Sequence, residues 1–217
     1  MTSIITTCVK CGGRGYTFDR GKSVRCECVL EASRRAEYHR AGLPEVCCGA
    51  DYLQSKSATA AAIFFRKIVT HASHELVWIH VAHLQTRIDC AAYPIRHAID
   101  SGRKAGYRLV DDGVNAIFKP NEPESERWNI DVRNAHALAI VVNDDTASKF
   151  VPQVIADVLI KRSSRACLTI IATRDDIREM PAKYGATLAA RVKALPSSRV
   201  LRDKAALQSI HRLGGRP

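Results

Sequence analysis

The chain has 217 residues, of which 46% are apolar and 25% are charged, as in soluble globular proteins. This length accommodates one domain of ordinary size and a small additional module. No stretch approaches 18 uninterrupted apolar residues, which argues against a transmembrane helix, and the first residues lack the basic and apolar regions of a secretory signal. We therefore expect a cytoplasmic protein with no membrane partner, in a reducing setting that disfavours disulfides.

The formal net charge of +11 is large for this length and favours an anionic partner such as nucleic acid, although a basic solvated surface is the alternative. The charge is concentrated toward the end of the chain. From residue 190 onward a single acid, Asp203, is set against seven basic residues: Arg191, Lys193, Arg199, Arg202, Lys204, Arg212 and Arg216. We expect residues 201–217 to be a basic tail that either follows phosphates or stays disordered.

Two close cysteine pairs stand near the start of the chain, Cys8 with Cys11 and Cys26 with Cys28. Each pair can supply two thiolates to one tetrahedral zinc ion. The residues between the pairs have the composition of a hairpin, with strands at 16–18 and 22–25 and a turn between them. The alternative is four buried or disulfide-bonded cysteines. The pattern favours zinc, although the C-x-C spacing of the second pair is less common than C-x-x-C.

A charged helix is expected over residues 29–40, where Gly42 and Pro44 then end it. It has few apolar positions, so we expect it to be exposed or to contact a partner. Residues 1–50 would form this N-terminal module, in which Cys47 and Cys48 are interpreted as packing residues.

The rest of the chain alternates between predicted strands and helices, and we assign residues 51–200 to one domain. After a helix-compatible run at 51–70, strands are expected at 76–81, 107–110, 137–142 and 167–172, and helices at 91–101, 151–161 and 186–194. The helix at 91–101 would carry Pro94 in its first turn, and residues 111–130 look polar and irregular. Apolar strands separated by helices predict an α/β fold with a parallel sheet covered by helices on both faces.

The front of the chain resembles the replicative-helicase loaders of bacteria and phages, the DnaC/DnaI type related to IstB transposition ATPases. The resemblance rests on C-x-x-C-G-G-x-G-Y, the C-x-C pair, the charged helix and the segment 41–44 (Ala-Gly-Leu-Pro). The body resembles the AAA+ ATPase domain of that family in three segments: a strand ending in two acids (138–145), a sensor strand (169–173) and an arginine-finger segment (184–192). The resemblance implies a replicative helicase of the DnaB type, or another loader, as partner. It also implies contact with single-stranded DNA and self-association.

The resemblance places a phosphate-binding P-loop at residues 81–88. A P-loop needs glycines whose amides surround the phosphate, a lysine that reaches it and a hydroxyl that holds Mg²⁺. Residues 81–88 contain no glycine, Arg87 would stand in for the lysine, and Ile88 cannot ligate Mg²⁺. Arg174 stands where the family has the sensor asparagine. We therefore expect zinc as the cofactor, no ATP binding by the usual route, and no hydrolysis.

Three residues could be remnants of the catalytic site. In an active relative Asp144 would hold Mg²⁺ and Asp145 would polarise the attacking water. Without a P-loop we expect these acids to cap the following segment or to pair with Arg174 or Arg162. Arg191 could be a finger that serves a neighbouring subunit, but a surface arginine at a self-association face is the preferred interpretation.

Nucleic-acid or partner binding is expected at seven basic residues: Arg34, Arg35, Arg40, Arg199, Arg202, Lys204 and Arg212. The leading hypothesis is a replication accessory protein that binds a helicase, and single-stranded DNA, without turnover. It would act as a loader or as a regulator of loading, in the host cytoplasm if it is phage-encoded. The alternatives are an active but atypical AAA+ ATPase and a stand-alone zinc-containing DNA-binding protein, for which Tyr16, Phe18, Tyr38 and Trp128 are the candidate stacking residues.

Overall fold

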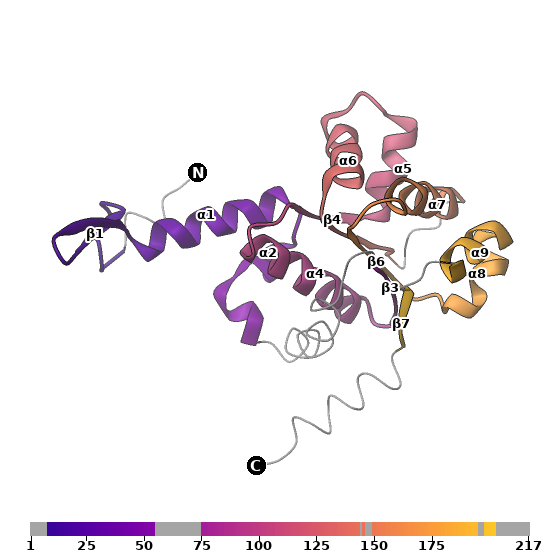
Figure 1. The fold of residues 1–217 in the computed structure, drawn as a ribbon, viewed down its shortest axis with the longest axis horizontal. Coiled ribbons are helices and arrows are strands. Elements are labelled where there is room, and N and C mark those ends of the chain that lie inside the picture. Colours follow the sequence, from indigo (N-terminus) through magenta and orange to yellow (C-terminus); the bar gives the residue numbers. More distant parts are fainter. Residues whose placement is uncertain (1–7, 55–74, 144, 146–148, 195–197, 203–217) are drawn as a thin grey trace, which may run out of the picture.

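The computed structural model describes residues 8–54, 75–143, 145, 149–194 and 198–202. A hairpin and a long helix extend as an arm from a body built on a parallel sheet (Figure 1). The arm consists of β1 (Tyr16–Asp19), β2 (Lys22–Arg25) and α1 (Glu27–Arg40). Within the described part of the chain, no helix has the length and apolar character needed to cross a membrane.

The body contains the remaining elements. In chain order they are α2 (Glu45–Cys48), η2 (Ala50–Gln54), β3 (Glu75–His80), α4 (Leu84–Asp100), β4 (Ala105–Leu109), α5 (Val110–Phe118), α6 (Pro123–Asn134), β5 (Ala137–Val141), α7 (Val151–Arg162), β6 (Leu168–Thr173), η3 (Ile177–Glu179), α8 (Met180–Tyr184), α9 (Ala186–Ala194) and β7 (Ser198–Arg202). The sheet has the order β4-β5-β6-β3-β7, and every neighbouring pair is parallel.

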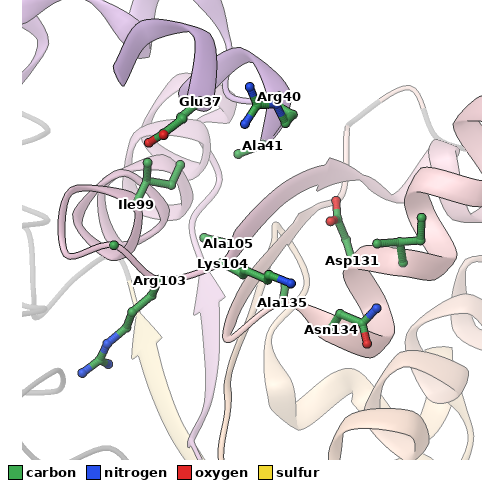
Figure 2. A pocket seen from close by; sticks show the side chains of 12 residues that line it. Glu37, Arg40, Ala41, Ile99, Arg103, Lys104, Ala105, Asp131, Asn134 and Ala135 are labelled. Atoms are coloured by element: carbon green, nitrogen blue, oxygen red, sulfur yellow. The ribbon is translucent and has the colours of Figure 1, made fainter. Parts of the chain in front are cut away.

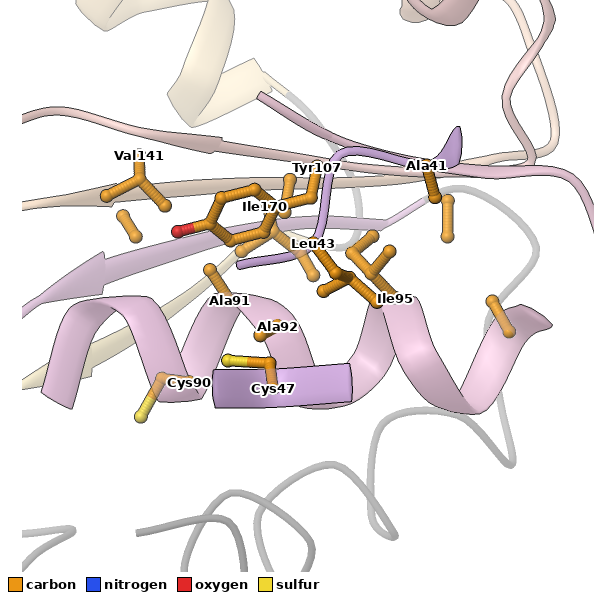
Figure 3. Close-up of a cluster of buried hydrophobic side chains, with 14 of the residues drawn as sticks. Ala41, Leu43, Cys47, Cys90, Ala91, Ala92, Ile95, Tyr107, Val141 and Ile170 are labelled. Carbon is orange, nitrogen blue, oxygen red and sulfur yellow. The ribbon is translucent and has the colours of Figure 1, made fainter. Parts of the chain in front are cut away.

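Side chains of the inner strands alternate between two cores, one on each face of the sheet. On β3, Val77 and Ile79 join the first core, whereas Leu76 and Trp78 join the second. Helix α4 and the chain between Tyr38 and Tyr52 cover the first core (Figure 3). Helices α5 to α9 cover the second core. The predicted parallel sheet with helices on both faces is confirmed.

The helix after β3 is longer than its sequence suggested. A start at residue 91 with Pro94 in the first turn is wrong, because α4 begins at Leu84 and Pro94 is its eleventh residue. Proline in a helix interior removes one hydrogen bond, here to the carbonyl of Cys90. Pro94 is buried, and packing of the apolar face of α4 in the first core compensates for this loss.

Residues 111–118 and 123–130 are helical, in α5 and α6, rather than irregular. Pro123 is the first residue of α6, where its missing N–H costs nothing. The Asp112 carboxylate accepts a hydrogen bond from the amide of Leu109 at the start of α5. Gly113 lies in α5 because a Cβ there would collide with Trp128 and Val154. Close packing of α5 against α6 and α7 therefore requires a glycine at this position.

Two other expectations concern residues at the limits of the described ranges. The helix expected at 51–70 begins inside the short helix η2, and residues 55–74 lie outside the described residues. Arg199 and Arg202, which we expected near or within a basic tail, belong to the edge strand β7. The division at residues 50 and 200 stays a prediction.

The arm joins the body along the other sheet edge, at β4. The amide of Tyr107 donates to the carbonyl oxygen of Ala41 over 2.7 Å, and the guanidinium of Arg108 donates to the same carbonyl over 3.3 Å. Arg108 also pairs with Asp131 of α6 at 2.5 Å. The Ala-Gly-Leu-Pro segment thus covers an edge strand that would otherwise expose its backbone.

The last turn of α1 is fixed by a second set of contacts. Tyr38 is the one buried residue of α1 and bonds through its hydroxyl to Asp100 of α4. Arg96 of α4 stacks over the Tyr38 ring and donates to the carbonyls of Cys47 and Gly49. Only the C-terminal end of α1 is therefore held by the body.

Gly42 provides a test of this joint. Its φ is +86°, and an added Cβ would meet the Tyr107 carbonyl and the Arg108 side chain. We expect Gly42→Ala to lower the free energy of unfolding by about 3 kcal/mol or more, since a left-handed residue costs about 1–2 kcal/mol and the collision adds to it. Gly102→Ala is the matched control, because Gly102 has φ +73° and open space around it. Equal losses in chemical denaturation would contradict the close approach at Gly42.

Candidate metal centre and candidate nucleotide edge

The four predicted ligand sulfurs lie together at the tip of the arm. The Sγ atoms of Cys8 and Cys26 are 3.8 Å apart, and those of Cys11 and Cys28 are 3.6 Å apart. All four lie within 4.8 Å of one another. A tetrahedral ion with Zn–S bonds of 2.3 Å would separate its sulfur ligands by about 3.8 Å. The four cysteines are therefore close enough to hold one metal ion.

Backbone amides support this cluster. The amide of Gly15, at φ +79°, points to the Cys11 sulfur over 3.4 Å, and the Gly15 carbonyl accepts from the Cys26 amide over 2.9 Å. The hydrogen bond from Gly15 lowers the pKa of the Cys11 thiol to about 7. A lowered pKa favours the thiolate, which is the form that binds metal. The cluster thus fits a zinc ion in both geometry and chemistry.

A different arrangement occurs at the carboxyl edge of the sheet, where the resemblance placed the P-loop. Three residues, 81–83, join β3 to α4, whereas the P-loop pattern spans about eight residues from its first glycine to its Ser or Thr. Residues 84–88 form the first turn of α4 instead of a loop. The short connection leaves no ring of free backbone amides of the kind that surrounds a phosphate.

Arg87 lies inside this edge rather than at a ligand site. Its side chain is 1% exposed, and its Nη1 donates to the carbonyl oxygen of Val142, at the end of β5, over 3.1 Å. A P-loop lysine would extend toward the phosphates. The guanidinium of Arg87 instead connects α4 to the neighbouring strand end.

The structure describes only some of the other residues that were candidate remnants of a catalytic site. Asp145 is exposed, Asp144 lies outside the described residues, and Arg191 falls within α9 without a described side chain. Arg174 is exposed as well. Arg162, one expected partner of the acids, is buried at the opposite, amino-terminal end of the strands. Its guanidinium donates to the Thr169 hydroxyl and to four backbone carbonyls, those of Asp131, Val132, Ala135 and Leu168.

Asp175, just after β6, was missed by the sequence reasoning. Its carboxylate accepts from the Tyr184 hydroxyl over 2.7 Å and pairs with Lys183, and its carbonyl accepts from the Trp78 indole over 3.2 Å. Burial raises the pKa of this carboxyl, but the hydrogen bonds from Lys183 and Tyr184 outweigh burial and lower it. Asp175 therefore anchors α8 to the sheet edge. The signal that could have revealed it was an acid in the segment that follows the sensor strand.

The predicted basic contacts are dispersed. Arg34 and Arg40 are exposed on α1, and Arg35 is half-buried and paired with Glu45. Arg199 and Arg202 lie on β7 without described side chains, whereas Lys204 and Arg212 lie outside the described residues. The structure thus brings together the metal ligands, and among the basic residues with described side chains it places Arg34, Arg35 and Arg40 on α1.

Arg40 lines a pocket at the joint of arm and body (Figure 2). This pocket has a volume of about 430 Å³ and lies between the ends of α1, α4 and α6. Its charged lining is mixed, with Glu37 and Asp131 beside Arg40 and Lys104. A lining of both signs does not indicate one class of ligand.

These features define an AAA+-like α/β domain that carries a cysteine knuckle on a projecting arm. No family model and no curated protein matches the sequence. Among solved structures, the crystal structure of DnaI aligns with a TM-score of 0.50 at 11% identity, covering 68% of this chain and 86% of that chain. The crystal structure of the DnaC helicase loader aligns with a TM-score of 0.49 at 14% identity, covering 67% of this chain and 90% of that chain. At such identities the likeness is one of fold, and it agrees with the fold that the resemblance to the helicase loaders implied.

Metal content tests the knuckle. We expect the purified protein to carry about one zinc per chain and Cys11→Ser to lose it, because three remaining sulfurs hold the ion far more weakly. Cys167→Ser is the control, since Cys167 lies outside the cluster. Elemental analysis measures both variants. A wild-type protein without metal, or one that keeps full zinc after Cys11→Ser, would contradict the assignment.

Proposed function

We propose that this protein is a DNA-replication accessory protein of the helicase-loader type, which docks on a replicative helicase through its N-terminal module. The observation that carries the proposal is the metal-site geometry at the tip of an arm, in front of a DnaI-like fold. The front motifs of the sequence support it independently. Binding would not require turnover, so the same interaction could load a helicase or regulate its loading.

The arm is suited to docking because its tip is not covered by the body. Val9, which lies between Cys8 and Cys11, and Leu30, which lies two residues after Cys28, are both exposed. Lys10 pairs with Glu27 at 2.7 Å, which ties the first cysteine turn to the start of α1. A rigid knuckle with exposed apolar side chains loses little conformational freedom when it binds another protein.

The nucleotide edge supports binding without hydrolysis. Catalysis of phosphoryl transfer relies on positioned amides, a lysine and Mg²⁺. The three-residue connection offers none of these, and Arg87 is engaged with the Val142 carbonyl. We therefore propose zinc as the resident cofactor and a role that does not include ATP hydrolysis by the P-loop route.

Capture of a helicase tests the first part. We expect immobilised wild-type protein to retain a DnaB-type helicase, and Cys11→Ser to reduce capture at least tenfold because the knuckle loses its ion. Leu30→Ser should also weaken capture, whereas Leu53→Ser should not. These two leucines are matched in exposure, 43% and 45%, but Leu53 lies in η2, off the arm. Absence of capture by the wild type would remove the proposal.

Nucleotide binding tests the second part. A ligand present at 100 times its Kd stabilises the native state by about 2.7 kcal/mol. We expect 1 mM ATP with Mg²⁺ to leave the melting temperature unchanged and to yield no phosphate release, with DNA present or absent. Turnover that Asp144→Asn abolishes would instead establish an active, atypical ATPase.

A further inference from the structure

The hairpin of the arm exposes both of its faces. Residues paired across β1 and β2 share a face, and the register pairs Tyr16 with Arg25 and Phe18 with Ser23. These four residues form one surface, which we call the aromatic face. The opposite face carries Thr17 and Val24 with the last pair of the hairpin. No strand residue of this hairpin is buried, so the described part of the chain covers neither face.

Two rings dominate the aromatic face. Tyr16 and Phe18 are 43% and 69% exposed, and their centroids lie 6.0 Å apart in an edge-to-face arrangement. Two other rings that could have stacked on bases, Tyr38 and Trp128, are each only 3% exposed. Among these four candidates, only the hairpin pair is available to a ligand.

Two arginine residues lie near this aromatic pair in the hairpin. Arg25 shares the aromatic face, and Arg20 stands in the turn next to it. Arg20 has φ +47° and Gly21 has φ +77°, as a two-residue hairpin turn of type I′ requires. Asn, Asp or Gly would adopt this conformation more easily than arginine does. An arginine held at this position indicates that its charge has a use at the tip of the hairpin.

We propose that the aromatic face binds single-stranded DNA, with bases stacked on Tyr16 and Phe18 and phosphates contacted by Arg20 and Arg25. Exposed aromatic side chains beside positive charge form the general platform for single strands, because every base has a face that can stack. The inference goes beyond the proposed docking on a helicase: it takes up the single-stranded DNA that the sequence resemblance implied and assigns that contact to the arm. It does not depend on capture of a helicase.

Substitutions of Phe18 distinguish stacking from general apolar contact. We expect Phe18→Leu to weaken binding of a labelled oligo-dT strand roughly 5- to 100-fold in fluorescence anisotropy, the range for loss of one stacked base. Phe18→Trp should retain or strengthen binding. Val24→Ser, on the opposite face and 45% exposed, is the matched control and should bind as the wild type does. Each variant is compared at equal zinc content.

Fluorescence gives a direct readout of the stacked ring. Trp78 and Trp128 are both buried, at 1% and 3% exposure. The indole introduced by Phe18→Trp is therefore the accessible one among the described tryptophan positions. We expect oligo-dT to quench its emission and to protect it from acrylamide. A ring with a purely structural role would show neither effect.

Arg20→Asn separates affinity from stability. Asparagine suits the turn better, so we expect the variant to be at least as stable as the wild type and to retain its zinc. Its DNA affinity should nevertheless fall, and the slope of log K against log salt should decrease by about 0.7, the value for one phosphate contact on a single strand.

Two results would overturn the inference. Oligo-dT binding unchanged in both Phe18→Leu and Arg20→Asn would show that DNA does not use this face. Loss of helicase capture in Phe18→Leu with unchanged DNA affinity would assign the face to a protein partner instead. Failure of the wild type to capture a helicase, with DNA binding that follows the predicted pattern, would remove the proposed docking and leave this inference intact.

Discussion

The contact between the Tyr107 amide and the Ala41 carbonyl is the constraint on which the arrangement of this molecule depends. It closes the free edge of β4, and the same carbonyl receives the Arg108 guanidinium, which in turn reaches Asp131 on α6. One short segment therefore protects the sheet edge and orients the arm. Without it, the described contacts that hold α1 would be those of Tyr38 and the pairs of Arg35 and His39 with Glu45, and the direction of the knuckle relative to the body would be less firmly fixed.

The cysteine cluster and the carboxyl edge of the sheet differ in how their polar side chains are used. At the knuckle, four sulfurs converge at the spacing that an ion requires, and a backbone amide favours the thiolate form of Cys11. At the carboxyl edge of the sheet, the corresponding polar groups are used within the protein. Arg87 bonds to a strand end, and Asp175 fixes α8 through Tyr184 and Lys183. These contacts hold α4 and α8 at this edge of the sheet.

Much of this architecture could be predicted from local patterns. Apolar runs located β3, β5 and β6, and cysteine spacing with an Arg-Gly turn located the knuckle. The errors came from residues whose role is set by packing. Pro94 resembled a helix start because its lost hydrogen bond is compensated only by tertiary contacts. Residues 111–130 looked irregular because the packing of α5 and α6 against the second core cannot be recognised locally. Arg87 meets the Val142 carbonyl across 55 residues and Asp175 meets the Trp78 indole across 97 residues, so these two contacts could not be predicted from local patterns.

Helix α1 has 14 residues and is therefore about 21 Å long. Because the body fixes one of its ends, it acts as a spacer of set length rather than as a flexible tether. A flexible linker would let tip and body reach partners over a range of separations, whereas this spacer selects those whose two contact points match its span. The length of α1 would thus set the separation between the contact made by the tip and the contact made by the body. Inserting or deleting one helical turn would displace the tip by about 5 Å and rotate it little.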